Sequence, residues 1–352
     1  MQFLKTLFWN RDERRLRAVW RLVGQLVLLL VIMLPLQVAL GLLAFGLLAV
    51  QEGIPLDQLA SPEAAERLTT RVPQFVMQSP LVLFLSTAVL FVTVVLSVWL
   101  AGRLLDRRRF ADFGFHFSAN WWADLGFGLV LGAFLMLLIF LVELAAGWVT
   151  VSDAFVTRNP QAIFPLAMLA PLVMFIGVGI QEELLSRGYQ LQNMAEGFNL
   201  PVIGPRAAIW LAAVLSSAIF GSLHIFNPNA GLVSSFNIFL AGLLLLGAGR
   251  LLTGELAIPI GVHITWNFFQ GNVLGFPVSG VDYRWATVFA TQQHGPELWT
   301  GGAFGPEAGL LGVLAMLLGA LLITLWVRWR YGRAGLCRAL AGAPQRPVML
   351  EN

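Results

Sequence analysis

Charged residues are scarce in this chain of 352 residues. They make up 12% of it, whereas soluble domains contain about 25%, and hydrophobic residues make up 58%. A soluble fold of this composition would have to expose large apolar patches to water. The composition therefore excludes an ordinary soluble enzyme and predicts an integral membrane protein.

Cysteine is almost absent, which excludes two further classes of structure. The single cysteine, Cys337, lies in an Arg-rich tail, so neither a disulfide framework nor a Cys-based metal site is expected. The first hydrophobic segment is long and has no clear small-residue cleavage site, so we interpret it as a retained span. With no internal repeat and no large polar region, residues 1–352 are expected to form a single integral membrane domain.

Long apolar runs dominate what is present. A spanning helix needs about 20 predominantly apolar residues, and the chain offers about eight such segments, which predicts an all-α polytopic fold around an intramembrane polar cavity. The predicted spans are residues 22–50, 79–101, 122–149, 163–185, 206–226, 231–250, 256–274 and 306–328.

Basic residues predict the orientation of these spans. With eight spans, the N-terminal segment, the loop after the second span and the C-terminal tail all lie on one side, and these segments carry most of the arginines. The positive-inside rule places that side in the cytoplasm. We therefore expect a multi-pass protein of the cell membrane, in a bacterium the inner membrane, with both termini cytoplasmic. The external connections would be residues 51–78, 150–162 and 275–305, the last of them an irregular loop or a lid.

Two adjacent glutamates, Glu182 and Glu183, follow an uncharged run over residues 164–180. A carboxylate at membrane depth costs roughly 2.5–3.5 kcal/mol on insertion scales, which makes such a residue a functional-site hypothesis by default. Residues four apart share a helix face, whereas adjacent residues point about 100° apart. Glu183 is therefore predicted to pair with Arg187, which leaves Glu182 to face a reactive cavity.

Two of the four histidines lie in or beside later spans. His224 is four residues after Phe220, and His263 is four residues before Asn267, so each pair shares a helix face. A lone intramembrane polar residue more often joins helices together, and we interpret Glu143 of the third span in that way. The hypothesis of a chemical site depends on three spans carrying polar groups at helical spacing.

This set of residue types favours hydrolysis. A carboxylate held away from water becomes a usable base near neutral pH and can take a proton from attacking water. An imidazole and a side-chain amide can donate hydrogen bonds to the oxyanion that forms. The chain has no Gly-x-Ser-x-Gly, no Gly-x-Gly-Asp within a span and no His-Glu-x-x-His, so serine, aspartyl and zincin mechanisms are not indicated. A glutamate and two histidines can also hold zinc, and the sequence leaves that alternative open.

Three motifs in this order resemble those of the CPBP (ABI) intramembrane proteases, which include the type II CAAX prenyl endopeptidases, the Ras-converting enzymes. They are Glu182-Glu183-x-x-x-Arg187, Phe220-x-x-x-His224 and His263-x-x-x-Asn267. The resemblance covers a core of about residues 163–274. It implies endoproteolysis within or at the edge of the membrane.

The resemblance also implies a role for each motif residue. Glu182 would be the general base, His224 would position the water or the base, and His263 with Asn267 would form the oxyanion site. Glu183, Arg187 and Phe220 would support them. The family has been described both as metalloproteases and as glutamate proteases. A divalent metal such as zinc would be held by Glu182, His224 and His263.

The expected partners are the lipid bilayer and a membrane-embedded or lipidated peptide or protein substrate, and no nucleic acid. Two alternatives are a non-catalytic scaffold or bacteriocin-immunity-type protein, and a transporter with a proton relay, although the inverted repeats typical of transporters are absent. Simple straight spans would place His224 and His263 near opposite ends of their helices. A shared site therefore requires tilted, offset or broken helices around the cavity.

Overall fold

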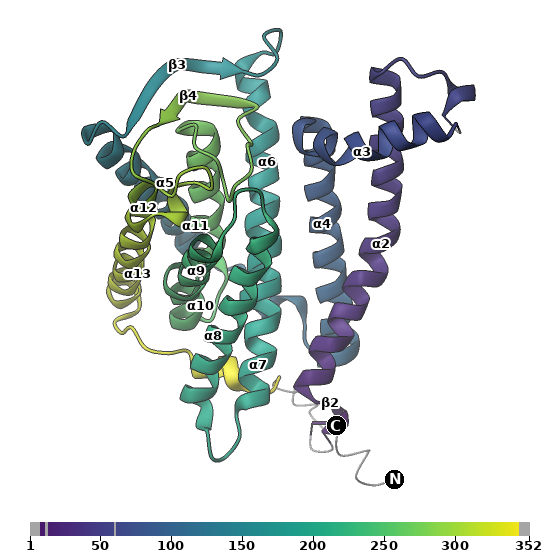
Figure 1. Ribbon diagram of the computed structural model, residues 1–352. Helices are drawn as coiled ribbons and strands as arrows, with labels where there is room; N and C mark the ends of the chain where they lie inside the picture. The colour runs from purple at the N-terminus through teal and green to yellow at the C-terminus, as the bar shows by residue number, and fades with distance from the viewer. Residues whose placement is uncertain (1–7, 11–12, 60, 345–352) are drawn as a thin grey trace.

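The computed structural model describes residues 8–10, 13–59 and 61–344, and most of these residues are helical (Figure 1). The helices are α2 (Ala18–Gln51), α3 (Pro62–Gln78), α4 (Pro80–Ala101), α5 (Ala119–Ala145), α6 (Phe164–Glu183), α7 (Leu191–Phe198), α8 (Gly204–Leu223), α9 (Leu232–Leu240), α10 (Gly247–Thr253), α11 (Ala257–Phe268), α12 (Glu297–Thr300) and α13 (Leu310–Tyr331). This confirms the predicted all-α polytopic class.

Several spans continue through π-helical segments instead of ending. The π-helical segments are η2 (Gly102–Asp106), η4 (Leu184–Gln190), η6 (Ala241–Leu246) and η7 (Phe269–Val273). Through η4, α6 and α7 form one 35-residue rod, so the mixed segment after Glu183 extends the fourth span. Such π segments are rare and frequently mark functional sites.

Within the described residues, seven helices are long and apolar enough to cross a membrane. The remaining predicted span, 256–274, forms the 12-residue α11 followed by the five-residue η7, and is shorter than those seven. Most of α11 is buried inside the protein, where it need not match the thickness of the bilayer.

Small residues let α11 pack against its neighbours with close backbone contact. A Cβ added to Gly132 of α5 would lie 2.4 Å from the Val262 carbonyl oxygen, and one on Gly261 of α11 would lie 2.5 Å from the Leu125 carbonyl oxygen. Such contacts between small residues are a common way of joining helices in membranes, where water provides no hydrophobic driving force. They fix the backbone of α11 immediately before His263.

The predicted external connections are more ordered than expected. Residues 62–78 form α3, which starts at the Ser61 cap and packs against α2 and α4. The strands β3 (Val149–Thr157) and β4 (Ala286–Gln293) pair antiparallel and cover one end of the helices (Figure 1). The expectation of an irregular 275–305 loop was therefore wrong, because backbone groups of its β4 segment pair with the distant strand β3. Gln293 Nε2 also donates to Glu143 Oε2 at 2.9 Å, which joins β4 to α5.

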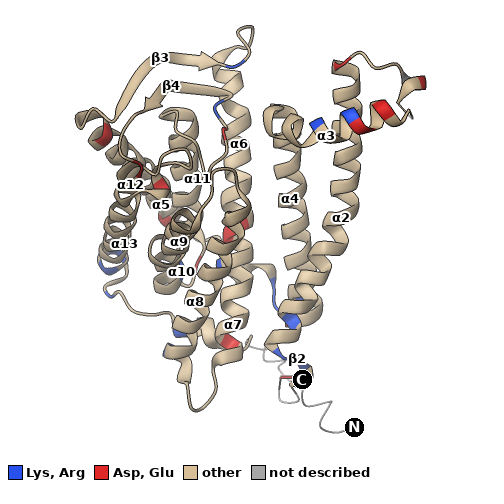
Figure 2. Cartoon of the chain, in the orientation of Figure 1, with Lys and Arg blue, Asp and Glu red and all other residues tan. Residues whose placement is uncertain are grey.

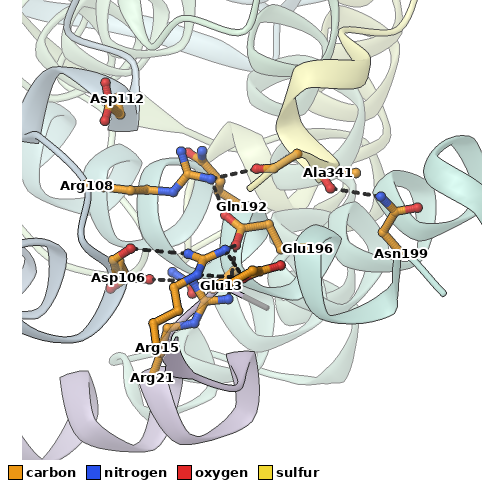
Figure 3. A network of polar contacts seen from close by, with 12 residues as sticks. Glu13, Arg15, Arg21, Asp106, Arg108, Asp112, Gln192, Glu196, Asn199 and Ala341 are labelled. Carbon is orange, nitrogen blue, oxygen red and sulfur yellow. Dashed lines mark hydrogen bonds and ion pairs between the residues drawn. The ribbon is translucent and has the colours of Figure 1, made fainter. Parts of the chain in front are cut away.

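At the opposite end, a buried ionic network joins segments that are distant in the sequence (Figure 3). Glu196 of α7 accepts from Arg15 at 2.6 Å, from Arg21 at 3.0 Å and from Arg108. Arg21 also donates to Asp106, at the end of η2, at 3.0 Å. The network holds the N-terminal segment and the α2–α4 pair against the α6–α7 rod. The arginines of the described residues are concentrated toward this end in Figure 2.

Candidate active site in the membrane

The two glutamates lie at the junction of α6 and η4, and their surroundings differ. The Glu183 side chain is completely buried, whereas 29% of the Glu182 side chain is exposed. The structure contains the predicted ion pair between Glu183 and Arg187, with a distance of 3.0 Å between Oε1 and Nη1. Glu182 faces a cavity, as the helix spacing predicts.

His263 of α11 lies between these two carboxylates. Its Nδ1 is 2.9 Å from Glu183 Oε1, which is the same oxygen that accepts from Arg187. Its Nε2 is 3.7 Å from Glu182 Oε2. Glu183 therefore links the first and third sequence motifs, and it fixes the orientation of the imidazole ring beside Glu182.

His224 lies immediately after α8, in the short 3₁₀ segment η5 (His224–Phe226). Its Nδ1 is 2.8 Å from the carbonyl oxygen of Phe220. Because a carbonyl oxygen only accepts hydrogen bonds, Nδ1 must carry the proton of this contact. In the neutral ring, Nε2 is then free to accept a hydrogen bond from water.

Phe220 connects the second motif to the other two. Its ring lies edge-on to the ring of His263, with centroids 6.4 Å apart, and 4.8 Å from the ring of His224. The Arg187 guanidinium stacks over Phe220 at 4.2 Å, a cation–π contact that is strong where water is excluded. Gly242 of η6 packs directly on Arg187, and a Cβ at that position would lie 2.6 Å from Nη2.

The four residues predicted to be catalytic line one cavity of about 470 Å³. They are Glu182, His224, His263 and Asn267, which come from three segments of the chain. They converge because α8 ends at Leu223, just before His224, while the short α11 begins inside the protein. The opposite wall is apolar and is formed by residues of α2 and α4, including Leu29, Met33 and Leu90.

Sequence reasoning missed several polar residues near this site, and three of them come from the connection after η7. Ser279 and Tyr283 line the cavity, and Glu307 lines a smaller space that shares His224, His263 and Asn267. Burial, followed by the nearby negative charge of Glu182, raises the pKa of Tyr283 above its ordinary value. The only sign of this connection's structure in the sequence is the Ser279-Gly280 pair, which is typical of a turn.

The arrangement of the candidate ligands does not fit a metal ion. Within the described part of the chain, no group of three His, Cys, Asp or Glu residues is positioned to hold one. Glu182, His224 and His263, the predicted zinc ligands, are therefore not arranged to bind zinc together.

Comparison with known proteins agrees with the geometry. Residues 164–269 match the family model described as type II CAAX prenyl endopeptidase Rce1-like, and this segment contains all three motifs. The chain is also 24% identical over 235 residues to the uncharacterized protein YyaK of Bacillus subtilis, covering 66% of this chain and 73% of that protein. No solved structure matches. The apolar helices indicate a multi-pass membrane protein, and the segment 164–269 is similar to the CAAX protease family.

Proposed function

From the match of residues 164–269 to the Rce1-like family, we propose that this protein is an intramembrane endopeptidase that uses glutamate-activated water. The observation that carries the proposal is the convergence of Glu182, His224, His263 and Asn267 on one cavity. A carboxylate, two imidazoles and an amide supply a base and hydrogen-bond donors for hydrolysis of a peptide bond.

Glu182 acts as the general base in this proposal. It takes a proton from water as the water oxygen attacks the carbonyl carbon of the substrate. Nε2 of the neutral His224 ring accepts the second hydrogen of that water and orients it. When the C–N bond breaks, the Glu182 carboxyl returns the proton to the leaving amine. The products are a new carboxylate and a new amine.

His263 and Asn267 stabilise the oxyanion. Because Nδ1 of His263 donates to Glu183, Nε2 can donate into the cavity only when the ring carries both protons. The proposal therefore uses the doubly protonated ring, flanked by Glu182 and Glu183. Asn267, one turn later on α11, contributes a side-chain N–H. Removing a single oxyanion donor from an enzyme typically costs about 10²–10³ in kcat.

The cavity wall favours an amphiphilic substrate. Leu29, Met33 and Leu90 place apolar side chains from α2 and α4 opposite the polar residues. An apolar wall beside a hydrolytic site fits a peptide that carries a lipid or a membrane-embedded segment. We infer that the substrate is membrane-associated or lipidated and that the basic end of the protein faces the cytoplasm.

Peptide cleavage by the purified protein tests this proposal. A panel of membrane-embedded and prenylated peptides would be incubated with wild type, Glu182→Ala and His263→Ala, with the exposed His294→Ala as the control. We expect wild type and the control to cut the same bond and the two site variants to lose at least about 100-fold in rate. Equal rates for all four proteins would show that the site is wrong. A folded wild type that cuts no peptide in the panel would favour the scaffold alternative.

A further inference from the structure

A second large cavity is remote from the candidate active site, at the end where the arginines are concentrated. It has a volume of about 870 Å³ and lies between the start of α5, the end of α10, the end of α13 and the segment that follows α13. That segment is anchored to the helices, because Cys337 N donates to the Leu251 carbonyl oxygen at 2.8 Å.

The cavity presents positive charge that is not neutralised within the described structure. Arg206, Arg333 and Arg338 line it, and none of their three side chains makes a hydrogen bond or ion pair with another described residue. Both carboxylates in the lining are already engaged. Asp124 accepts from two side chains of α13, and Glu255 lies 2.9 Å from Nδ1 of His116. The lining therefore offers guanidinium groups to an anion.

An apolar groove lies beside this cavity, on the same two helices α5 and α13. It has a volume of about 380 Å³ and runs along α5 and α13, lined by Phe127, Val130, Leu131, Phe134, Leu322, Leu325, Trp326 and Trp329. Trp326 lines the groove and links it to the cavity. Its ring stacks on Phe127 with centroids 4.4 Å apart, while its Nε1 donates to Asp124 in the cavity at 2.8 Å.

We propose that this cavity and groove together form a binding site for an anionic glycerophospholipid. The arginines would hold the phosphate headgroup, and the acyl chains would lie in the groove between α5 and α13. Basic pockets between spanning helices are suited to anionic headgroups, and arginine binds phosphate oxygens with two parallel hydrogen bonds. Tryptophan at this level suits the interface between headgroups and acyl chains. The site is independent of the proposed protease activity.

The test measures lipid binding to the full-length purified protein by native mass spectrometry. The probes are dioleoylphosphatidylglycerol, dioleoylphosphatidylcholine and inorganic phosphate. The cavity variant is Arg333→Gln/Arg338→Gln, and the control is Arg103→Gln/Arg109→Gln, which removes the same charge at the same end but outside the cavity. A third variant, Leu325→Trp, fills the groove without altering charge.

We expect wild type and the control pair to prefer phosphatidylglycerol over phosphatidylcholine. The cavity pair should bind phosphatidylglycerol roughly 30-fold more weakly, equivalent to about 1 kcal/mol for each arginine. Leu325→Trp should also weaken binding, and Arg333→Lys/Arg338→Lys should restore most of it, which separates lost charge from misfolding. Equal losses in the cavity and control pairs, equal affinity for the two lipids, or binding of phosphate as tight as that of the lipid would each overturn the proposal.

Discussion

The carboxylate of Glu183 lies 2.9 Å from Nδ1 of His263, although the two residues are 80 positions apart in the chain. The same oxygen accepts a hydrogen bond from Arg187, and all three side chains are buried. Glu183 is thus the group through which the α6–η4 junction holds the imidazole of α11 in the site.

Replacement of Glu183 by glutamine is expected to destabilise the protein and reduce its activity. The change leaves the buried Arg187 without a counter-charge and weakens the hold on His263. Loss of one partner from a buried ion pair typically costs about 3–5 kcal/mol. Thermal unfolding in detergent measures the loss. Arg71→Gln, which disrupts an exposed ion pair with Glu52, should cost less than about 1 kcal/mol. Similar losses in the two variants would contradict this account.

Gly242 provides a test that leaves every motif residue unchanged. An alanine there would place its Cβ 2.6 Å from Arg187 Nη2 and 3.3 Å from the Phe220 ring. Overpacking of this kind costs about 1–3 kcal/mol, and the displaced Arg187 should lower the cleavage rate about tenfold or more. Gly126→Ala is the matched control, because no atom lies within 4 Å of its added Cβ. If both alanine variants cleave as fast as wild type, Arg187 does not support the site.

Glu307 should make stability depend on pH near neutrality. Burial raises its pKa from 4.5 to about 7, and hydrogen bonds from Ser279 and Gln270 oppose only part of that rise. The folded protein therefore binds a proton more tightly than the unfolded chain does. The stability that proton binding by Glu307 contributes to the folded state is fully present below pH 4.5 and is lost as the pH rises to about 7. The difference is about 3 kcal/mol.

Glu307→Gln should remove this dependence. Melting temperatures of wild type and variant would be compared from pH 4.5 to pH 8. We expect wild type to lose stability relative to the variant across that window. A difference between the two proteins that stays constant with pH would show that Glu307 does not titrate there.

Removal of metal is expected to leave cleavage unchanged. The described residues contain no group of three potential ligands close enough for a metal, and the proposed steps use only side chains and water. The measurement is the rate of peptide cleavage before and after chelation, with the metal content verified by elemental analysis. A loss of activity on chelation that is restored by zinc would require the site to rearrange around a metal.

The spans were predictable because uncharged runs of about 20 residues have few alternatives to crossing a membrane. The exception was α11, which is too short to be one of the seven candidate spans. Its apolar composition predicts burial, but it does not show whether lipid or protein surrounds the helix. The pairing of β3 with β4 was not predictable, because the two strands are short and far apart in the sequence. The helix over residues 62–78 was missed, although Ser61 and Pro62 form a typical helix start.

The site was partly predictable from the sequence, because helical spacing is a local pattern. Helical spacing identifies contacts within one helix, such as Glu183 with Arg187 and Phe220 with His224. It contains no information about contacts between helices, so the hydrogen bond from His263 to Glu183 was not foreseen. Ser279 and Glu307 reach the site through the packing of the connection between η7 and α13, which has no periodic pattern.

The role of Glu182 as the general base is tested most directly by the cleavage rate of Glu182→Gln, measured on a peptide that wild type cuts. Glutamine preserves the size and shape of the side chain but cannot take the proton from water. We expect a rate at least about 100-fold lower than that of wild type, with an unchanged melting temperature. A Glu182→Gln protein that cuts as fast as wild type would show that Glu182 is not the base.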